Sequence, residues 1–367
     1  MVLIFSSVAM PVGAVIPAAF PDDPHTSDTI RIGLLIPDSV HSRAERPVRL
    51  AMEEAGGNSG FPGTKLQLVV RSTEGPWGAG SKESVSLVYD DRVSAILGAL
   101  DGRNGHLAEQ VAAKSHLTYL ETVATESTLS QAFVPYFMRC IPNDDQQARA
   151  ILNKIDQLGK GDLAILSIDQ YDIQSAARSF QRIASSENRN PPWILSIPPA
   201  GFTRDQLLDQ LRERNVKNLV LPFRSGFTEG LPAFFRQNAP GINLYATLAF
   251  IADLSADEAT WNELEGMFVF STGLHHTPEG KEFQKRFKAR FGQLPTTSCA
   301  YTYDGAIILI EAIRKAGSDR EAIRDTLCSM MESQGVSGSI SFDEMGNRKG
   351  PFELVRVTGG IPVAASE

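Results

Sequence analysis

The sequence has 367 residues, a net charge of −8 at pH 7 and 42% hydrophobic residues. A single hydrophobic core rarely grows beyond about 250–300 residues, so this length predicts two lobes. Acidic and basic residues are interspersed along the chain, which argues against a nucleic-acid partner, because such proteins carry a basic face. No uninterrupted apolar tract of about 18 residues is present, so the sequence predicts no membrane-spanning helix.

The N-terminal segment has the composition of an export signal. Its first 20 residues are apolar and rich in small residues, and the polar spacer PDDPHTSD follows. We expect residues 1–27 to be a signal peptide and disordered spacer, with cleavage after Ala14, Ala18 or Ala19. No Lys or Arg precedes the apolar run, which a start codon assigned too far downstream would explain; a plain apolar tail is the alternative. No Cys lies near the cleavage zone, so we expect a periplasmic protein without a lipid anchor.

Strands and helices alternate from Asp28 onward. The first half of the chain is predicted to contain strands at Thr29–Pro37, Lys65–Arg71, Val93–Leu97 and Leu117–Leu120. Helical spacing covers Val48–Ala55, Gly80–Asp90 and Gly105–Ser115, and Asn58–Gly63 is predicted to be a turn. Buried apolar strands separated by helices are typical of a parallel sheet covered on both faces.

A second unit repeats this pattern. Its predicted helices are Gln146–Leu158, Asp172–Ser185, Thr203–Arg214 and Gly230–Asn238. Its predicted strands are Leu163–Ile168, Trp193–Ile197, Leu219–Pro222, Asn243–Ala246 and Met267–Phe270. No repeat of about 20–50 residues recurs, which excludes solenoids and propellers. The fold class is therefore predicted to be α/β, with two doubly wound units in series.

Chemistry-bearing residue types form no catalytic or metal-binding motif. The sequence has three cysteines, Cys140, Cys299 and Cys328. They lack metal-binding spacing, and buried unreactive thiols are favoured over the single disulfide that export would permit. The loop histidines His41 and His106 and the adjacent pair His275 and His276 have no fixed ligand spacing, so no metal site is expected. A nucleophile elbow and a dinucleotide fingerprint are also absent from the sequence, so we expect neither enzyme activity nor a cofactor.

Four segments in a fixed order carry a family resemblance. They are IRIGLLIP, NSGFPGTKLQLVV, LLDQLRERNVKNLVLPF and the helix–turn–helix and strand-pair region from Pro278 to Arg356. Together they resemble the type I periplasmic solute-binding proteins, and more narrowly the leucine/isoleucine/valine-binding family. Those proteins are extracytoplasmic ligand receptors of ABC importers. The resemblance runs from about Ile30 to Val357.

The resemblance implies two lobes joined by a three-crossover hinge. By position the crossovers fall near Ile141–Asn143, Ser271–Gly273 and Gly338–Ser341. The N-lobe is expected to comprise residues 28–141 and 272–338, and the C-lobe residues 142–271 and 339–367. Hinges of this kind let two rigid lobes close over a ligand.

Two N-lobe loops match ligand-binding loops of the family. In the loop after Leu97, Gly102 takes the position of a key serine and Arg103 lies beside it. A helix N-terminus with an arginine can hold a carboxylate, although Arg103 could instead point to solvent or bind an acidic neighbour. In the next loop, Thr125 matches a threonine whose hydroxyl meets the ligand carboxylate, and Val123 matches a carbonyl facing an ammonium. A plain N-cap for a helix is the alternative at Thr125.

On the C-lobe, Tyr171 matches an aromatic residue that covers the ligand, and a surface tyrosine is the alternative. Phe223 and Arg224 end a strand and should border the cleft, with a salt bridge as the alternative for Arg224. Leu248 lies where amino-acid binders place an acidic residue against the ligand ammonium. A buried ammonium without a charged partner is unfavourable, so this departure argues against a standard amino acid unless Asp253 substitutes.

We therefore expect a non-enzymatic, monomeric receptor that delivers a small-molecule ligand to an ABC permease. The expected ligand is a carboxylate, aromatic or amide-bearing metabolite. Two alternatives remain open: a ligand-sensing or regulatory subunit without transport, and a receptor for branched-chain amino acids.

Overall fold

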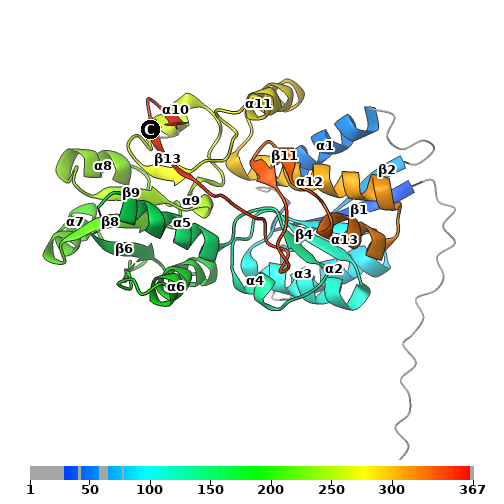
Figure 1. The fold of residues 1–367 in the computed structure, drawn as a ribbon, viewed down its shortest axis with the longest axis horizontal. Coiled ribbons are helices and arrows are strands. Elements are labelled where there is room, and N and C mark those ends of the chain that lie inside the picture. Colours follow the sequence, from blue (N-terminus) through cyan, green and yellow to red (C-terminus); the bar gives the residue numbers. More distant parts are fainter. Residues whose placement is uncertain (1–28, 40–42, 58–64, 77, 160, 364–367) are drawn as a thin grey trace, which may run out of the picture.

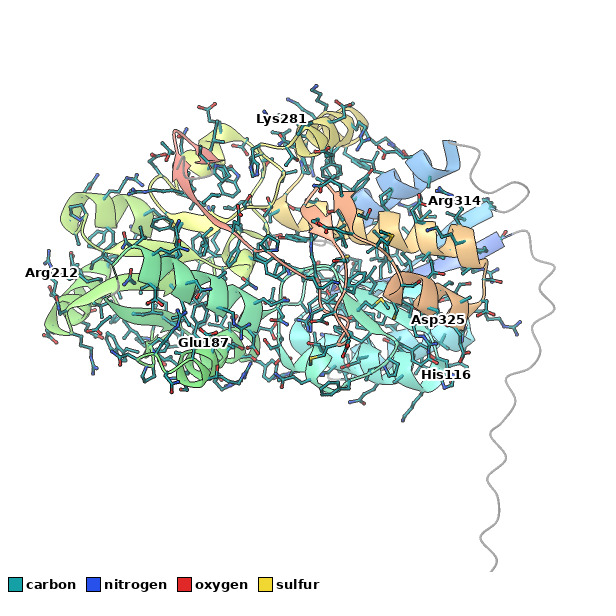
Figure 2. The ribbon with its side chains drawn as sticks, in the orientation of Figure 1. His116, Glu187, Arg212, Lys281, Arg314 and Asp325 are labelled. Atoms are coloured by element: carbon teal, nitrogen blue, oxygen red, sulfur yellow. The ribbon has the colours of Figure 1, made fainter. Side chains whose placement is uncertain are left out.

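The computed structural model describes residues 29–363 apart from 40–42, 58–64, 77 and 160. The expected signal peptide and the turn at Asn58–Gly63 lie outside the described residues. Two lobes lie side by side, each built on its own sheet (Figure 1). Charged side chains fringe both lobes, for example Arg212 on one and Asp325 on the other (Figure 2). No helix in the described ranges is both long and apolar enough to span a membrane.

The N-lobe is built on a five-stranded parallel sheet in the order β2-β1-β3-β4-β5. Its strands are β1 (Thr29–Ile36), β2 (Lys65–Ser72), β3 (Ala95–Gly98), β4 (Thr118–Glu121) and β5 (Phe137–Arg139). The helices of this lobe are α1 (Glu45–Gly57), α2 (Ala79–Tyr89), α3 (Gly102–Ser115), α4 (Thr128–Gln131), α11 (Pro278–Phe291), α12 (Thr297–Ala316) and α13 (Arg320–Cys328). The strands and helices predicted from the sequence are thus present, and the expected α/β fold with two lobes is confirmed.

Alternate side chains of each N-lobe strand enter different cores. Leu34 and Leu97 pack on one face with Leu309 of the almost wholly buried helix α12. Leu35 and Ile96 pack on the other face with Leu87 of α2. This alternation follows from the two-residue period of a strand, and both faces are apolar because helices cover both.

The C-lobe sheet has the order β14-β13-β10-β9-β8-β6-β7. Its strands are β6 (Asp162–Ser167), β7 (Trp193–Ser196), β8 (Val216–Leu221), β9 (Asn243–Ala246), β10 (Phe268–Phe270), β13 (Leu354–Thr358) and β14 (Ile361–Val363). Its helices are α5 (Asp144–Gln157), α6 (Tyr171–Ser186), α7 (Arg204–Glu213), α8 (Leu231–Asn238), α9 (Leu248–Ile251) and α10 (Glu258–Asn262). The neighbouring strands β7, β6, β8, β9 and β10 are parallel. Strand β13 pairs antiparallel with β10, and β14 pairs antiparallel with β13.

The chain crosses between the two sheets three times. The first crossover lies between β5 and α5, and the second between β10 and α11. The third comes later than the resemblance implied: β11 (Ser333–Gly335) and β12 (Gly338–Ile340) pair only with each other, and Phe342 still packs in an N-lobe core. Asn347 then bridges to Arg139 of β5, so the chain reaches the C-lobe sheet only at β13.

Polar side chains tie the first and third crossovers together. Asn143 and Gln146 form a capping box that begins α5, and Asn143 Nδ2 also donates to Asn347 Oδ1 over 3.0 Å. The buried Arg348 guanidinium donates to the Cys140 carbonyl at 3.0 Å and to Ser337 Oγ at 2.7 Å. Asp304 accepts the backbone N–H of Ser337 at 2.8 Å, so one network joins α12 to the hinge.

Replacing Arg348 should destabilise the whole protein. Arg348→Met would leave the Cys140 carbonyl without this donor and the buried Asp304 without its nearby positive charge, so we expect a loss of about 3 kcal/mol in the free energy of unfolding. Urea titration followed by circular dichroism measures this loss. Arg46→Met, which changes an exposed N-lobe arginine, should alter stability by less than about 0.5 kcal/mol. Equal stabilities of the two variants would contradict a structural role for Arg348.

The three cysteines are unbridged in the structure. Cys140 and Cys299 are buried, as expected, and burial raises the pKa of the Cys140 thiol to about 12. The expectation of burial is wrong for Cys328, which is exposed because it ends α13 at the surface.

Alkylation should therefore distinguish Cys328 from the other two thiols. With excess iodoacetamide at mildly alkaline pH, the folded protein should gain one adduct by mass spectrometry and the urea-unfolded protein three, because reagent reaches only an exposed thiolate. Cys328→Ser should abolish labelling of the folded protein. Labelling of Cys140 at a similar rate would contradict the packing described above.

Candidate functional site

The two lobes touch where two N-lobe loops meet helix α6. These loops follow β3 and β4, at the carboxyl edge of the sheet, where ligands bind in open α/β folds. Gly102 donates its backbone N–H to Asp172 Oδ2 across the lobes over 3.3 Å. Ser175 Oγ donates to Glu126 Oε1 over 3.0 Å. These two hydrogen bonds join the lobes directly.

The loop after β3 ends in the N-terminus of α3. Asp101 caps this helix by accepting the Asn104 N–H at 2.9 Å. The absence of a side chain at Gly102 is required here, because a Cβ would lie 2.8 Å from Glu126 Cβ and 3.0 Å from Asp172 Oδ1. Arg103 extends from the same turn, with its guanidinium 5.4 Å from the centre of the Tyr171 ring.

The loop after β4 is folded around a buried carboxylate. Glu121 Oε1 accepts the backbone N–H groups of Thr122, Val123 and Ala124 at 2.9, 2.7 and 2.9 Å. Tyr119 donates its hydroxyl to the other oxygen at 2.5 Å. Burial raises the pKa of Glu121, while these donors oppose the rise. The three amides of this turn are therefore already paired inside the protein.

A fully buried arginine holds the second half of that loop. Arg139 of β5 donates to the carbonyls of Ala124 and Glu126 at 3.2 and 2.8 Å. Thr125 accepts the Asp144 N–H through its carbonyl at 2.7 Å. Burial raises the pKa of Asp144 to about 8, although Thr125 and Arg139 oppose this rise.

Glu126 is the polar centre of the contact. His106 Nε2 lies 3.0 Å from Glu126 Oε2, and the other ring nitrogen lies 3.3 Å from Glu109 Oε2. Hydrogen bonds to Glu109 and Glu126 raise the pKa of His106 to about 9. Burial disfavours the charged form of Glu126, but hydrogen bonds from His106, Thr128 and Ser175 lower its pKa to about 2. Both groups are therefore charged at neutral pH.

Three of the expected site residues, Gly102, Arg103 and Tyr171, lie at this lobe contact, and Tyr171 begins α6 with 38% of its surface exposed. Val123 and Thr125 lie in the loop after β4, which reaches α6 through Glu126. Val123 donates its N–H to Glu121 at the start of the same loop, and Thr125 bonds to Asp144 at the start of α5.

The remaining three expected residues lie elsewhere in the C-lobe. Phe223 and Leu248 are buried in its core, because an apolar side chain at a strand end continues the core of its own lobe. Leu248 donates its N–H to Gln147 Oε1 at 2.8 Å. Arg224 pairs with Glu229 and Glu263 at 3.1 and 3.0 Å, which is the salt-bridge alternative.

Sequence reasoning missed Asp172, Glu126 and Glu121. A signal for Asp172 was present, because the chain has a glycine at the position of the key serine and an acidic residue directly after Tyr171. Gly102 and Asp172 meet only in the folded protein, because they belong to different lobes. Glu121 and Glu126 lie on either side of Val123 and Thr125, whose carbonyl and hydroxyl groups were the expected ligand contacts.

Two cavities lie away from this lobe contact. A cavity of about 650 Å³ in the C-lobe lies against Gly161 and Val216, at the amino ends of its strands. Ligands of open α/β sheets bind at the carboxyl ends instead. A cavity of about 160 Å³ lies at the hinge beside Tyr301 and Arg348. In the part of the chain that the structure describes, no three His, Cys, Asp or Glu side chains are grouped to hold a metal ion.

Comparison with known proteins relates nearly the whole described chain to one family. Residues 29–360 match the family described as periplasmic binding protein. Among curated relatives, glutamate receptors 3.4 and 2.2 of Arabidopsis thaliana are each 22% identical, over 91% and 69% of this chain and over 39% and 28% of the receptors. The chain thus spans well under half the length of these relatives.

Solved structures of two solute-binding proteins share the fold. An ABC transporter substrate-binding protein from Desulfitobacterium hafniense, in complex with Leu, has a TM-score of 0.75 at 21% identity, covering 90% of this chain and 98% of its own. A solute-binding protein of an ABC transporter from R. palustris, in complex with benzoate, has a TM-score of 0.76 at 14% identity, covering 92% and 95%.

The His106–Glu126 pair should make stability depend on pH. His106 has a folded pKa near 9 against an ordinary 6.5, so its contribution is complete below pH 6.5 and disappears as pH rises through 9. The free energy of unfolding of the wild type should therefore fall by about 2 kcal/mol more than that of His106→Gln between pH 6.5 and 9.5, as measured by urea titration. His116→Gln, at an exposed histidine, should behave like the wild type. Parallel pH profiles of the wild type and His106→Gln would contradict this pairing.

Proposed function

Because the chain belongs to the periplasmic binding protein family, we propose that it is the extracytoplasmic receptor of an ABC importer and closes its two lobes over a small polar ligand. Proteins of this family bind solutes and are not enzymes. The observation that carries the proposal is the polar contact between α6 and the loops after β3 and β4. It lies at the carboxyl edge of the N-lobe sheet and joins the two lobes.

The proposed binding surface consists of Gly102, Arg103, Val123, Thr125 and Tyr171. The first four belong to the N-lobe and Tyr171 to the C-lobe, so a ligand held among them would favour the closed arrangement. Moving an open–closed equilibrium from 1:99 to 99:1 takes about 5.5 kcal/mol of differential affinity. A micromolar ligand supplies about 8 kcal/mol in total, so closure of this kind is within reach.

The proposed ligand is a carboxylate, aromatic or amide-bearing metabolite rather than a standard amino acid. The structures related in fold were solved with Leu in one case and benzoate in another, so this fold accommodates both aliphatic and aromatic ligands. Branched-chain amino acids remain the alternative ligand. A periplasmic location after removal of the signal peptide, a monomeric state and an inner-membrane permease as partner belong to the same proposal.

A second candidate function is ligand sensing without transport. The similarity to plant glutamate receptors favours it, because part of each receptor aligns with this chain. Neighbouring genes for a permease and an ATPase would favour import, and a neighbouring sensor kinase would favour regulation.

A thermal-shift screen over carboxylates, aromatic acids, amides and amino acids tests the receptor proposal. A ligand at 100 times its dissociation constant should stabilise the folded protein by about 2.7 kcal/mol. The double variant Arg103→Ala/Tyr171→Ala should then weaken binding of that compound at least about tenfold by calorimetry, since it removes contacts from both lobes.

The matched control is Arg46→Ala/Tyr89→Ala, which removes the same residue types from exposed N-lobe positions. It should keep the wild-type affinity. A screen in which no compound stabilises the protein would argue against a receptor, and an unchanged affinity of Arg103→Ala/Tyr171→Ala would place the ligand elsewhere.

A further inference from the structure

Five backbone N–H groups in the two loops at the lobe contact are bound to carboxylates of the protein itself. At the N-terminus of α3, Asp172 takes the Gly102 N–H and Asp101 takes the Asn104 N–H. In the loop after β4, Glu121 takes three successive N–H groups. A ligand carboxylate that approached these five N–H groups would have to displace one of these internal carboxylates.

The contact of Asp172 with the N-lobe depends on the glycine at position 102. Gly102 lacks the side chain that would fill the space at the start of α3, and the carboxylate of Asp172 enters that space from the other lobe. Any larger residue at position 102 would meet both Asp172 and Glu126. The glycine and the aspartate therefore make one complementary contact across the lobes.

The surrounding charge also disfavours an anion. Burial raises the pKa of Asp172, and the nearby charges of Asp101 and Glu126 raise it further, whereas the Gly102 N–H and the charge of Arg103 oppose the rise. Two nearby cations already have partners within the protein: His106 lies between Glu109 and Glu126, and the buried Arg139 binds loop carbonyls. Arg103 stacks over Tyr171 at the rim.

One acceptor at this contact remains unused. Asp172 Oδ1 is buried and has no hydrogen-bond partner among the described residues, while Oδ2 holds the Gly102 N–H. A buried acceptor that lacks a donor is unfavourable, and a donor from a ligand would satisfy it. A carboxylate has no proton to offer at neutral pH, whereas a carboxamide or an amine does.

We propose that Asp172 determines ligand specificity: it excludes a carboxylate from the N-terminus of α3 and selects a ligand that presents a carboxamide or amine N–H to its free oxygen. This inference rests on the proposed receptor function and narrows its ligand class. Residues of the N-lobe alone would make an anion site of the α3 N-terminus. Asp172 occupies that site with the protein's own carboxylate.

Matched pairs of compounds that differ only at the carboxyl group test this directly. Benzoate with benzamide and leucine with leucinamide are titrated by calorimetry against the wild type, Asp172→Asn and Asp169→Asn. Asp169 is an exposed acidic residue in the loop just before α6, bonded only to Gln174 in the described structure, so its variant removes one carboxylate as Asp172→Asn does. Circular dichroism first establishes that all three proteins are folded.

The wild type should bind the amide of a pair at least about tenfold more tightly than its carboxylate, because like charges brought together inside a binding site are strongly unfavourable. Asp172→Asn should reduce that ratio at least about tenfold or admit a carboxylate that the wild type rejects, and Asp169→Asn should keep the wild-type ratio. The proposal would be overturned if the wild type preferred the carboxylates, or if Asp172→Asn and the wild type had equal ratios of amide to carboxylate affinity. It would also be overturned if the wild type bound none of the four probes and Asp172→Asn bound no carboxylate either. The receptor function itself fails only if the broader screen yields no ligand at all.

Discussion

The lobe contact depends on buried and half-buried carboxylates that accept backbone N–H groups. A buried N–H without an acceptor destabilises a fold by about 1–3 kcal/mol, so the tight turns after β3 and β4 need acceptors near them. Glu121 supplies these for one turn, and Asp101 and Asp172 supply them for the other. Because Asp172 comes from the opposite lobe, the local hydrogen bonding of the N-lobe loop is coupled to the closure of the protein.

Hydrogen bonds at the hinge link two of the crossovers between the lobes. Asn143 of the first crossover bonds to Asn347 of the third, and Arg348 of the third bonds to the Cys140 carbonyl of the first, so these two segments are held together. A rotation about this connection would separate Asp172 from Gly102 while leaving the core of each lobe intact. Opening the contact would then break a few hydrogen bonds. The free energy of these bonds is small enough for the binding of a small ligand to shift the open–closed equilibrium.

The sequence predicted the fold well because apolar periodicity is a property of neighbouring residues. Strand β9 falls at the predicted Asn243–Ala246, whereas α3 begins at Gly102 rather than Gly105, since Asp101 caps it earlier. The site was harder to predict. Leu248 was expected to border the cleft, but its side chain lies in the C-lobe core. Asp172 and Gly102 are 70 residues apart, and their complementarity appears only when the lobes are brought together.

The central claim is that a ligand binds between the lobes with a hydrogen-bond donor against Asp172. A crystal structure of the protein with the most tightly bound compound from a ligand screen tests it most directly. The account predicts electron density between the N-terminus of α3 and α6, with a carboxamide or amine nitrogen within hydrogen-bonding distance of Asp172. A ligand carboxylate bound to the Gly102 N–H in place of Asp172, or a ligand seated outside the lobe contact, would contradict it.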